Sequence, residues 1–401
     1  MKILVVTQYF WPESFRINDL CIGLHERGHE VVVLTGKPNY PKGHFYDDYS
    51  FLNKRQERWN GIKIYRSPLI PRGNGGGIRL FINYLSFALF ASLKVLFIKG
   101  KYDKIFVYEP SPITVGIPAI VAKFKFNAPI YFWVQDLWPE SLIAGGGLNN
   151  TVIIRVFNSI TKFIYKHSKV ILVQSEAFRT YINNQGVIND KIVYYPNSTE
   201  AFYKVMKKDE VFDKLLPEGF KIMFAGNIGE AQDFETLLLA AKILKDKNVP
   251  VKWVILGDGR MKKHVENQIQ ELGLKSVFIL LGSYPAEDMP RFFSCVDGLI
   301  VSLKKNYIFS LTIPSKVQSY LACGKPLIAS LDGEGARIIK EAQAGIVAPS
   351  EDFESLAKAI EFLYFLSDDK RLSMGNSARE YFEKEFERET LIDKLEVILN
   401  E

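Results

Sequence analysis

Short apolar runs rich in β-branched residues alternate with helical patterns along most of the chain. In the first half these runs predict strands at residues 3–7, 30–35, 104–108, 129–135 and 170–174, with a helix at 17–27. In the second half they predict strands at residues 221–225, 251–256, 277–280, 298–301 and 326–329. Such alternation indicates α/β sheets of the doubly wound kind, which bind ligands at the carboxyl ends of their strands.

The alternation begins twice, because residues 2–8 and 221–229 each resemble the first strand of a nucleotide-binding sheet. Between them, Tyr194–Thr199 and a charged stretch up to Glu218 interrupt it. We therefore expect two Rossmann-like domains that face a cleft, at residues 1–198 and 199–380. The charged helical pattern at residues 381–401 is expected to pack back toward the first domain.

Composition narrows the class of protein further. The chain has 401 residues, of which 47% are hydrophobic and 24% charged, as in a soluble globular protein. The net charge of +6 comes from scattered basic residues without a recognition helix, so no nucleic-acid partner is expected. Cys21, Cys295 and Cys323 fit neither a disulfide framework nor a metal site, and no signal peptide is apparent. We expect a cytoplasmic protein without a bound metal.

The segment Leu80–Ile98 is the most apolar part of the chain. It is nearly long enough to span a bilayer, but it contains Asn83 and Lys94, which disfavour a full span. Its basic flanks suit a helix that lies on an anionic membrane surface. Burial inside the N-terminal domain remains the alternative.

Two glycine-containing turns of the second half follow predicted strands and precede helical patterns. Backbone N–H groups between Gly226 and Gly229 are suited to hold a phosphate, and the turn from Gly257 to Arg260 adds a cation. A strand-to-helix turn needs glycine with or without a ligand, so this signal leaves a purely structural role open.

A more specific signal comes from residues 312–326. Pro314 and Ser315 predict the start of a helix, with Ser315 as its cap and Lys316 in its first turn. A lysine opposes the helix dipole at that end, so its position makes sense if an anion binds there. A solvated lysine is the alternative.

In the first domain, Asp136 follows a predicted strand, where a carboxylate can accept the proton of an attacking hydroxyl. The loop that contains Glu13, Arg16 and Asn18 also carries aromatic residues, a combination suited to binding a sugar. A second loop, with Lys37 and Asn39, follows the next strand. Each of these segments can instead be a rigid turn or surface loop.

Four motifs in this order resemble the family 4 glycosyltransferases of GT-B architecture: residues 24–31, 226–229, 256–259 and 322–326. Residues 8–13, 35–41, 133–140 and 313–316 are more narrowly similar to the WbuB and CapL type, which is assigned to O-antigen and capsule assembly as N-acetyl-L-fucosamine transferases. The similarity runs over essentially the whole chain.

The resemblance implies a UDP-sugar donor, an undecaprenyl-diphosphate-linked saccharide acceptor, a peripheral position on the cytoplasmic face of the inner membrane, and no metal or other cofactor. Together with the strand ends and loops described above, this makes Asp136 and Glu13 the candidate catalytic residues. The candidate donor contacts are Gly226, Asn227, Gly229, Gln232, Gly257, Arg260, Lys316, Ser319, Gly333 and Glu334. The candidate acceptor contacts are Arg16, Asn18, Lys37 and Asn39.

The chain departs from the family at four donor positions. Many members have Arg and Lys where this chain has Asn227 and Gln232, and two Glu where it has Leu311 and Ser319. Glu334 is a candidate to replace the missing ribose contact. These differences leave open whether the family's donor contacts and anomeric retention apply. A nucleotide-sugar epimerase of the same architecture and a catalytically silent docking subunit are the alternative functions.

Overall fold

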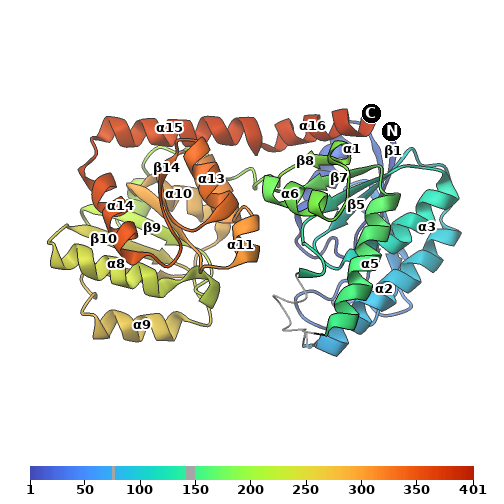
Figure 1. Ribbon diagram of the computed structural model, residues 1–401, viewed down its shortest axis with the longest axis horizontal. Helices are drawn as coiled ribbons and strands as arrows, with labels where there is room; N and C mark the ends of the chain where they lie inside the picture. Colours follow the sequence, from blue (N-terminus) through green and yellow to red (C-terminus); the bar gives the residue numbers. More distant parts are fainter. Residues whose placement is uncertain (75–76, 141–149) are drawn as a thin grey trace. The chain divides into compact units, whose positions relative to one another are not determined.

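The computed structural model describes residues 1–74, 77–140 and 150–401 (Figure 1). The chain forms two compact units. Unit 1 comprises Met1–Asn197 and Leu391–Glu401, and unit 2 comprises Ser198–Thr390. The last residues of the chain therefore belong to the same unit as the first.

The sheet of unit 1 has the order β3-β4-β2-β1-β5-β6-β7-β8 among the described residues. Its strands are β1 Lys2–Val6, β2 Glu30–Gly36, β3 Gln56–Trp59, β4 Ile62–Ser67, β5 Lys104–Glu109, β6 Ile130–Val134, β7 Val170–Val173 and β8 Ile192–Tyr194. All neighbours are parallel except β3, which runs antiparallel to β4. The strand order reverses direction between β1 and β5, which makes their carboxyl ends the expected ligand position.

Helices connect these strands and cover the sheet (Figure 1). They are α1 Arg16–Glu26, α2 Gly77–Phe97, α3 Gly116–Phe126, α5 Thr151–His167 and α6 Glu176–Asn184. The last helix of the chain, α16 Arg388–Asn400, contributes Leu391, Leu395 and Leu399 to the same hydrophobic core as β1 and β2. Arg27 and His29 pair with Glu396 of this helix, so the end of the chain is part of unit 1.

Unit 2 contains a fully parallel sheet with the order β11-β10-β9-β12-β13-β14. Its strands are β9 Phe220–Ala225, β10 Val251–Leu256, β11 Phe278–Gly282, β12 Gly298–Ser302, β13 Leu327–Ser330 and β14 Gly345–Ala348. Numbered from β9, this is the 3-2-1-4-5-6 order of a Rossmann sheet. The direction reverses between β9 and β12, so a ligand is expected where these two strands end.

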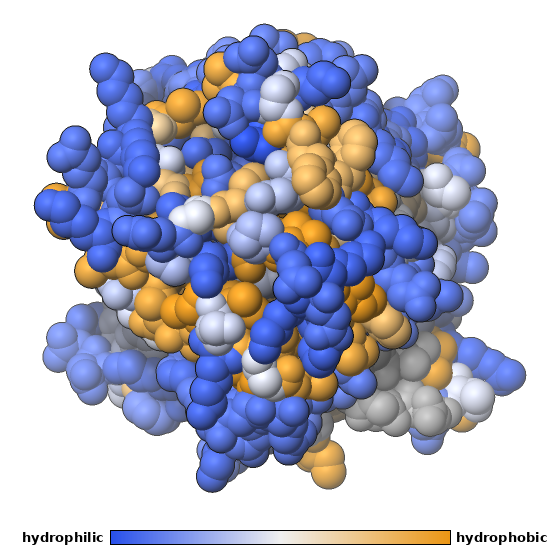
Figure 2. Space-filling view, turned by 90° about the vertical axis from the view of Figure 1, so that its left-hand side faces the viewer, coloured by the Kyte–Doolittle hydropathy of each residue, from blue (hydrophilic) through white to orange (hydrophobic). Residues whose placement is uncertain are grey.

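The helices of unit 2 pack on both faces of this sheet, where two separate hydrophobic clusters form. They are α7 Glu210–Asp213, α8 Phe234–Asp246, α9 Lys262–Glu271, α10 Met289–Ser294, α11 Tyr307–Leu311, α12 Ser315–Ala322, α13 Gly333–Glu341, α14 Phe353–Phe365 and α15 Asp368–Glu385. Figure 2 shows the side on which α9 and α14 lie in Figure 1, and hydrophilic side chains cover most of it.

Every predicted strand is confirmed, with ends that differ by at most two residues. The predicted helix at 17–27 is confirmed as α1, and Gly28 after it has the expected left-handed backbone, with φ +86°. All three cysteines are free, in agreement with a spacing that fits no disulfide framework, and all three are buried.

Helix α2 corresponds to the apolar segment that the sequence left with three alternatives. By length and composition it could cross a membrane, but 39% of its most apolar stretch is buried within the protein. The Asn83 side chain donates to the Ile70 carbonyl at 2.6 Å and accepts from the Gln8 amide at 2.7 Å. These buried bonds attach α2 to unit 1, so the spanning alternative would require their loss.

Candidate active site

In unit 2, the carboxyl end of β9 continues into a turn at Gly226, where φ is +138°. A Cβ atom on this residue would lie 2.6 Å from Cε and 2.9 Å from Nζ of Lys316. Glycine is required here because the lysine side chain fills that space and because L residues rarely adopt this φ. The structure therefore brings together two predicted donor contacts that lie far apart in the sequence.

Lys316 projects from the first turn of α12 and is half-buried. Burial lowers the pKa of its ammonium, and Nζ lies 4.9 Å from the centre of the Phe224 ring. Among the described residues, no oxygen forms an ion pair or hydrogen bond with Nζ. A partly desolvated cation without an acidic partner is suited to bind an anion, and a diphosphate carries that charge.

The helix that carries Lys316 starts differently from the prediction. Ser315 is the first helical residue, and Pro314 occupies the capping position without a side-chain hydrogen bond. The expectation that Ser315 caps this helix is therefore wrong. A proline at the cap has no side-chain oxygen, so the backbone N–H groups of this first turn receive no hydrogen bond from a capping side chain.

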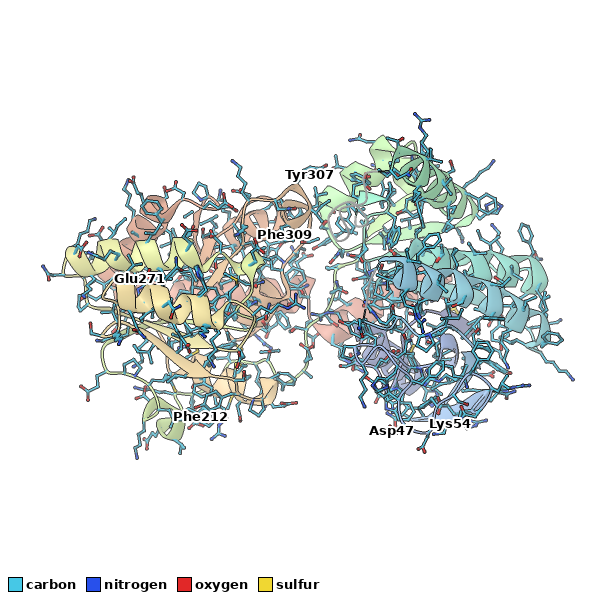
Figure 3. The ribbon with its side chains drawn as sticks, turned by 90° about the horizontal axis from the view of Figure 1, so that it is seen from below. Asp47, Lys54, Phe212, Glu271, Tyr307 and Phe309 are labelled. Carbon is cyan, nitrogen blue, oxygen red and sulfur yellow. The ribbon has the colours of Figure 1, made fainter. Side chains whose placement is uncertain are left out.

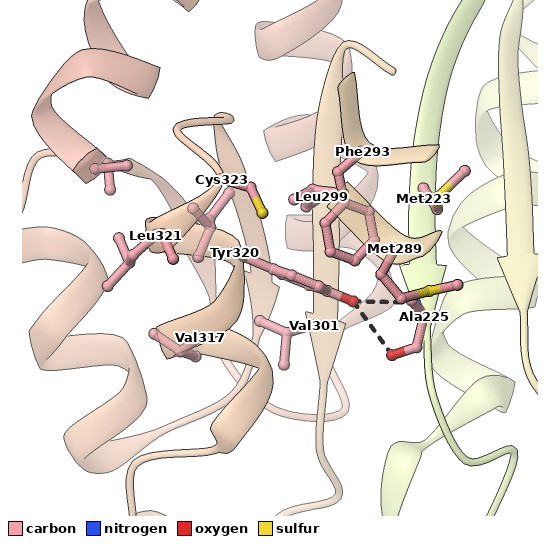
Figure 4. Packing of buried hydrophobic residues seen from close by; sticks show 14 of the residues in the cluster. Met223, Ala225, Met289, Phe293, Leu299, Val301, Val317, Tyr320, Leu321 and Cys323 are labelled. Carbon is pink, nitrogen blue, oxygen red and sulfur yellow. Dashed lines mark hydrogen bonds between the residues drawn. The ribbon is translucent and has the colours of Figure 1, made fainter. Parts of the chain in front are cut away.

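Tyr320 holds α12 against the end of β9 (Figure 4). Its hydroxyl accepts from the Ala225 N–H at 3.0 Å and donates to the Ala225 carbonyl at 3.4 Å. The ring is buried in the hydrophobic cluster of unit 2. Ala225 directly precedes Gly226, and Tyr320 lies one helical turn after Lys316. This contact therefore fixes the position of Lys316 relative to the Gly226 turn.

The second glycine turn packs directly against the first. The Gly226 carbonyl oxygen lies 1.8 Å from the position of a Cβ on Gly257, and the Ile228 N–H donates to the Asp258 carbonyl at 2.8 Å. The turns after β9 and β10 thus pack backbone against backbone, without room for a Cβ atom on Gly257. Arg260 follows the second turn and is exposed to solvent.

Asn227, Gly229 and Gln232 form a small hydrogen-bonded group. Gln232 Oε1 accepts from the Gly229 N–H at 3.1 Å and from Asn227 Nδ2 at 3.4 Å. The two residues that replace the family's Arg and Lys therefore close the turn on itself. They add no cation, which leaves Lys316 and Arg260 as the predicted cations of this region.

Three further predicted donor contacts lie on α12 and at the start of α13. The Ser319 hydroxyl donates to the Ser315 and Lys316 carbonyls within its own helix, at 3.2 Å each. The Glu334 carboxylate accepts two bonds from Arg337, both at 3.1 Å. To bind a ribose hydroxyl, the Glu334 carboxylate would have to accept it in addition to Arg337 or in place of Arg337.

Gly333 starts α13 with φ +69°. A Cβ there would lie 1.9 Å from the Ser310 carbonyl oxygen, so the helix start packs tightly on α11, which carries Tyr307 and Phe309 (Figure 3). A pocket of about 480 Å³ borders the same glycine. It is lined by Leu331, Asp332, Gly333, Ala336, Arg337, Lys340, Val347 and Pro349.

In unit 1, two carboxyl groups meet where β5 and β6 end. Glu109 is the last residue of β5, and Asp136 follows β6, as predicted. The Asp136 N–H points to Glu109 Oε2 at 3.5 Å, while Glu109 Oε1 is buried without a hydrogen bond to any described residue. Burial raises the pKa of Asp136 to about 7. Burial, and then the charge of Asp136, raises the pKa of Glu109 well above its usual value.

Sequence reasoning missed Glu109, although the rule that singled out Asp136 applies to it, because both follow buried parallel strands. Two other missed groups lie nearby: Tyr84 Oη approaches Ser111 Oγ at 3.5 Å, and Ser111 has φ +137°. Such a φ costs a non-glycine residue about 1–3 kcal/mol and is concentrated at functional sites. The sequence contains no signal for a positive φ at a serine.

Glu13, the second predicted catalytic group, is fully buried between two loops. It accepts the backbone N–H groups of Asn39 and Tyr40 at 2.8 Å each and of Phe10 at 3.3 Å. Burial raises its pKa to about 7. These bonds join the loops after β1 and β2, so Glu13 has a structural role whether or not it takes part in catalysis.

The predicted acceptor contacts fall into two groups. Lys37 and Asn39 are buried: Lys37 Nζ donates to the Lys54 carbonyl at 2.9 Å, and Asn39 Oδ1 accepts from the Arg72 N–H at 3.1 Å. Asn18 bonds the Glu13 carbonyl at 2.7 Å. Arg16 is half-buried and close enough to influence the Tyr108 hydroxyl electrostatically. Contact with an acceptor remains a prediction for all four.

No group of three or more His, Cys, Asp or Glu side chains suited to a metal ion occurs in residues 1–74, 77–140 and 150–401. The independence of the reaction from metal stays a prediction.

Comparison with known proteins agrees with this architecture. Residues 14–198 match the family model "Glycosyl transferase 4-like domain", and residues 206–381 match "Glycosyl transferases group 1". The chain is therefore a glycosyltransferase of the GT-B class, with a family 4-like domain followed by a group 1 domain.

Curated relatives match all or part of this length. It is 26% identical over 414 residues to WcaI of Escherichia coli K12, whose name assigns it as a glycosyl transferase to colanic acid biosynthesis, with 98% of each chain covered. It is 27% identical to the glycosyltransferase WbjE of Pseudomonas aeruginosa, with 57% of this chain and 58% of the relative covered. Among solved structures, Alr3699/HepE of Anabaena in complex with UDP superposes with a TM-score of 0.72 at 14% identity, with both chains fully covered. The specific N-acetyl-L-fucosamine transferase type is not confirmed by these relatives.

Proposed function

We propose that this glycosyltransferase moves N-acetyl-L-fucosamine from its UDP derivative to a saccharide on undecaprenyl diphosphate, in the synthesis of a bacterial capsule or O-antigen. The observation that carries the proposal is the half-buried Lys316 ammonium against the Gly226 turn. This cation has no anionic partner in the described part of the chain, and it lies at a Rossmann ligand position. Related solved structures contain UDP or UDP-glucose, and relatives are named for colanic acid and capsular polysaccharide synthesis.

In this proposal, unit 2 holds the donor. Lys316 neutralises the diphosphate, and backbone N–H groups of the adjoining turns supply further donors. As the bond from the anomeric carbon to the diphosphate oxygen breaks, negative charge grows on that oxygen. A cation fixed in advance stabilises this charge without reorganisation, which lowers the barrier. No metal ion is assigned to this role.

The acceptor hydroxyl is assigned to the strand ends of unit 1. Its oxygen forms the new bond to the anomeric carbon, the electron pair of the broken bond leaves with UDP, and the hydroxyl proton passes to Asp136. Asp136 must be ionised to accept this proton. Burial, and then the charge of Asp136, raises the pKa of the neighbouring Glu109 well above its usual value.

The lipid-linked acceptor places the enzyme at the cytoplasmic face of the plasma membrane as a peripheral protein. The apolar helix α2 supports this location, because a soluble substrate would not require an exposed apolar surface.

The test measures release of nucleoside diphosphate from UDP- and GDP-sugars, with and without a lipid-diphosphate-linked amino-sugar acceptor. We expect release that needs one UDP-sugar and the acceptor. Release or isomerisation without acceptor would replace the proposal with a hydrolase or an epimerase, and inactivity with every pair would favour a docking subunit.

Variants of the donor turn test the role of Lys316. Lys316→Ala should lower turnover by about 10²- to 10³-fold, as loss of a charge-stabilising group does. Lys263 is exposed on α9, so Lys263→Ala should leave turnover unchanged.

Gly226→Ala should also lower turnover, because the added methyl group would displace the Lys316 side chain. Gly186→Ala is its matched control, because Gly186 has φ +93° but open space around its Cβ position. Equal activity of Gly226→Ala and Gly186→Ala would contradict the assignment.

A further inference from the structure

The outward side of α2 carries a long stripe of apolar side chains. Seven exposed apolar side chains form one stripe at helical spacing: Ile78, Phe81, Ile82, Leu85, Leu89, Leu93 and Leu96. The buried side contains Asn83 and Ser86 beside a second set of apolar residues, which are Tyr84, Phe87, Ala88, Ala91 and Val95. A helix of a soluble domain normally has polar residues on its outward side and its apolar stripe only toward the core. The stripe therefore needs a partner outside unit 1.

Helix α5 extends this surface. It lies beside α2 (Figure 1), and Phe157 of α5 contacts Phe81 of α2 with ring centres 6.0 Å apart. Its exposed side combines apolar and basic residues: Val152, Arg155, Val156, Lys162, Phe163 and Lys166. We call the exposed residues of these two helices the α2/α5 face.

The charge of the α2/α5 face indicates which kind of partner it can bind. Helices α2, α3 and α5 contain no Asp or Glu, whereas α2 has two Lys or Arg residues, α3 has two and α5 has three. In α3, Lys123 and Lys125 are already bound to backbone carbonyls at the ends of α5 and α2. The exposed Arg155, Lys162 and Lys166 of α5 remain available toward a partner, together with Lys99 and Lys101 just after α2.

We propose that the α2/α5 face docks on the surface of an anionic lipid bilayer, with the apolar stripe at the level of the acyl chains and the basic residues at the phosphate headgroups. Apolar area combined with Lys and Arg, without acidic residues, matches the interior and surface charge of such a membrane. A second copy of the chain is disfavoured because it would bring basic surfaces together. The use of this contact, delivery of a lipid-linked acceptor, rests on the proposed function, but the contact itself does not.

The docked helix lies along the membrane and does not cross it. Asn83 bonds Gln8 and Ile70, while Lys125 Nζ donates to the Val95, Leu96 and Ile98 carbonyls at the end of α2. A span would break both sets of bonds and would draw the helix out of unit 1.

The test is sedimentation of the full chain with vesicles of phosphatidylethanolamine and phosphatidylglycerol, compared with vesicles of phosphatidylcholine alone. We expect binding to the anionic vesicles that weakens with salt. Leu89→Glu should lower the partition coefficient by about tenfold or more, because it places a charge in the apolar stripe. The double substitution Lys162→Ala and Lys166→Ala should lower it by roughly fivefold for each lysine.

Val397→Glu is the matched control, because Val397 is 61% exposed on α16, outside the α2/α5 face, and Leu89 is 58% exposed. It should bind vesicles as the unaltered protein does. Wild-type protein that stays in the supernatant, or Leu89→Glu that still binds, would overturn the proposal. Self-association that Leu89→Glu abolishes, without vesicle binding, would assign the face to a second copy instead.

A water-soluble acceptor analogue separates this inference from the enzymatic one. Leu89→Glu should keep normal diphosphate release with that analogue, because the substitution lies on an exposed helix surface. Vesicle binding without any transferase activity would support the docking face and contradict the proposed function, and activity without vesicle binding would do the reverse.

Discussion

At the scale of single residues, Glu109 and Asp136 show how burial tunes chemistry. Both carboxyl groups lie at the carboxyl ends of parallel strands, where the sheet brings them together. Water is largely excluded there, which disfavours the charged form and raises both pKa values. Asp136, with a pKa of about 7, is the group that changes charge near neutral pH.

The pH dependence of turnover tests this assignment. Because Asp136 accepts a proton only when ionised, kcat/KM should rise with pH and level off above its pKa of about 7. Asp136→Asn should remove this rise and lower turnover by about 10²- to 10⁴-fold. Glu109→Gln should leave the rise near its original pH, since burial causes the Asp136 shift.

Glu13 supplies the necessary comparison, because its pKa is also raised to about 7. If the rise vanished in Glu13→Gln and persisted in Asp136→Asn, Glu13 would be the base. A melting temperature measured for each variant separates this from unfolding, since Glu13 holds the two loops together.

The sequence patterns predicted the positions of site residues better than their contacts. Asp136 and Lys316 lie where the sequence placed them, after a strand and in a first helical turn, and their chemical roles stay predictions. Lys37 and Asn39 have suitable side chains for a sugar, but the structure uses them in buried bonds to neighbouring loops. Whether a polar side chain turns inward depends on loop conformation, which periodicity does not encode.

At the scale of elements, helix α12 and strand β9 are joined by hydrogen bonds and together position Lys316 beside the Gly226 turn. The Tyr320 hydroxyl joins them through both polar groups of Ala225, directly before the glycine turn. Lys316 and Tyr320 lie on the same side of α12, so a shift of the helix would move the ammonium as well.

Tyr320→Phe should therefore act on both stability and donor binding. Loss of a buried hydroxyl that leaves the Ala225 N–H without this partner should cost about 1–3 kcal/mol. The KM for the donor should rise several-fold. Tyr307 is exposed on α11, so Tyr307→Phe should change neither the free energy of unfolding nor this KM. Thermal unfolding and donor titrations measure the two effects, and a stability loss with an unchanged KM would show that Tyr320 does not position Lys316.

Strongly apolar strands were predictable, and weakly patterned elements were not. The hairpin of β3 and β4 contains Arg58, Lys63 and Arg66. These charged residues interrupt the apolar pattern by which a strand is predicted from the sequence. The short strands β8 and β14 are fixed by pairing with β7 and β13. For α2 the apolar run was evident, but only the structure shows which of its apolar residues are buried and which form the exposed stripe.

At the scale of the whole molecule, unit 1 is built from both ends of the chain. Leu391, Leu395 and Leu399 of α16 are buried in its core, and Glu396 pairs with Arg27 and His29. The stability of unit 1 thus depends on residues that follow unit 2 in the sequence.

Leu395→Ala should destabilise unit 1 by about 2–5 kcal/mol, as expected for a truncated buried leucine. Hydrogen exchange should become faster for the amides of β1 and β2 and remain unchanged for those of β9 and β10. Val397→Ala, exposed on the same helix, serves as the control and should change exchange in neither unit. Equal acceleration in both units after Leu395→Ala would mean that they unfold together.

The return of the chain to unit 1 makes unit 2 a topological insertion. The backbone enters unit 2 after Asn197 and leaves it after Thr390, while Met1 and Glu401 both belong to unit 1. A gene fragment for residues 198–390 encodes a contiguous domain, whereas a fragment that stops at residue 197 lacks a core helix of the other domain. Joining Asn197 to Leu391 through a short linker is the way to express unit 1 alone, and a protease cut within unit 2 leaves every segment of unit 1 in place.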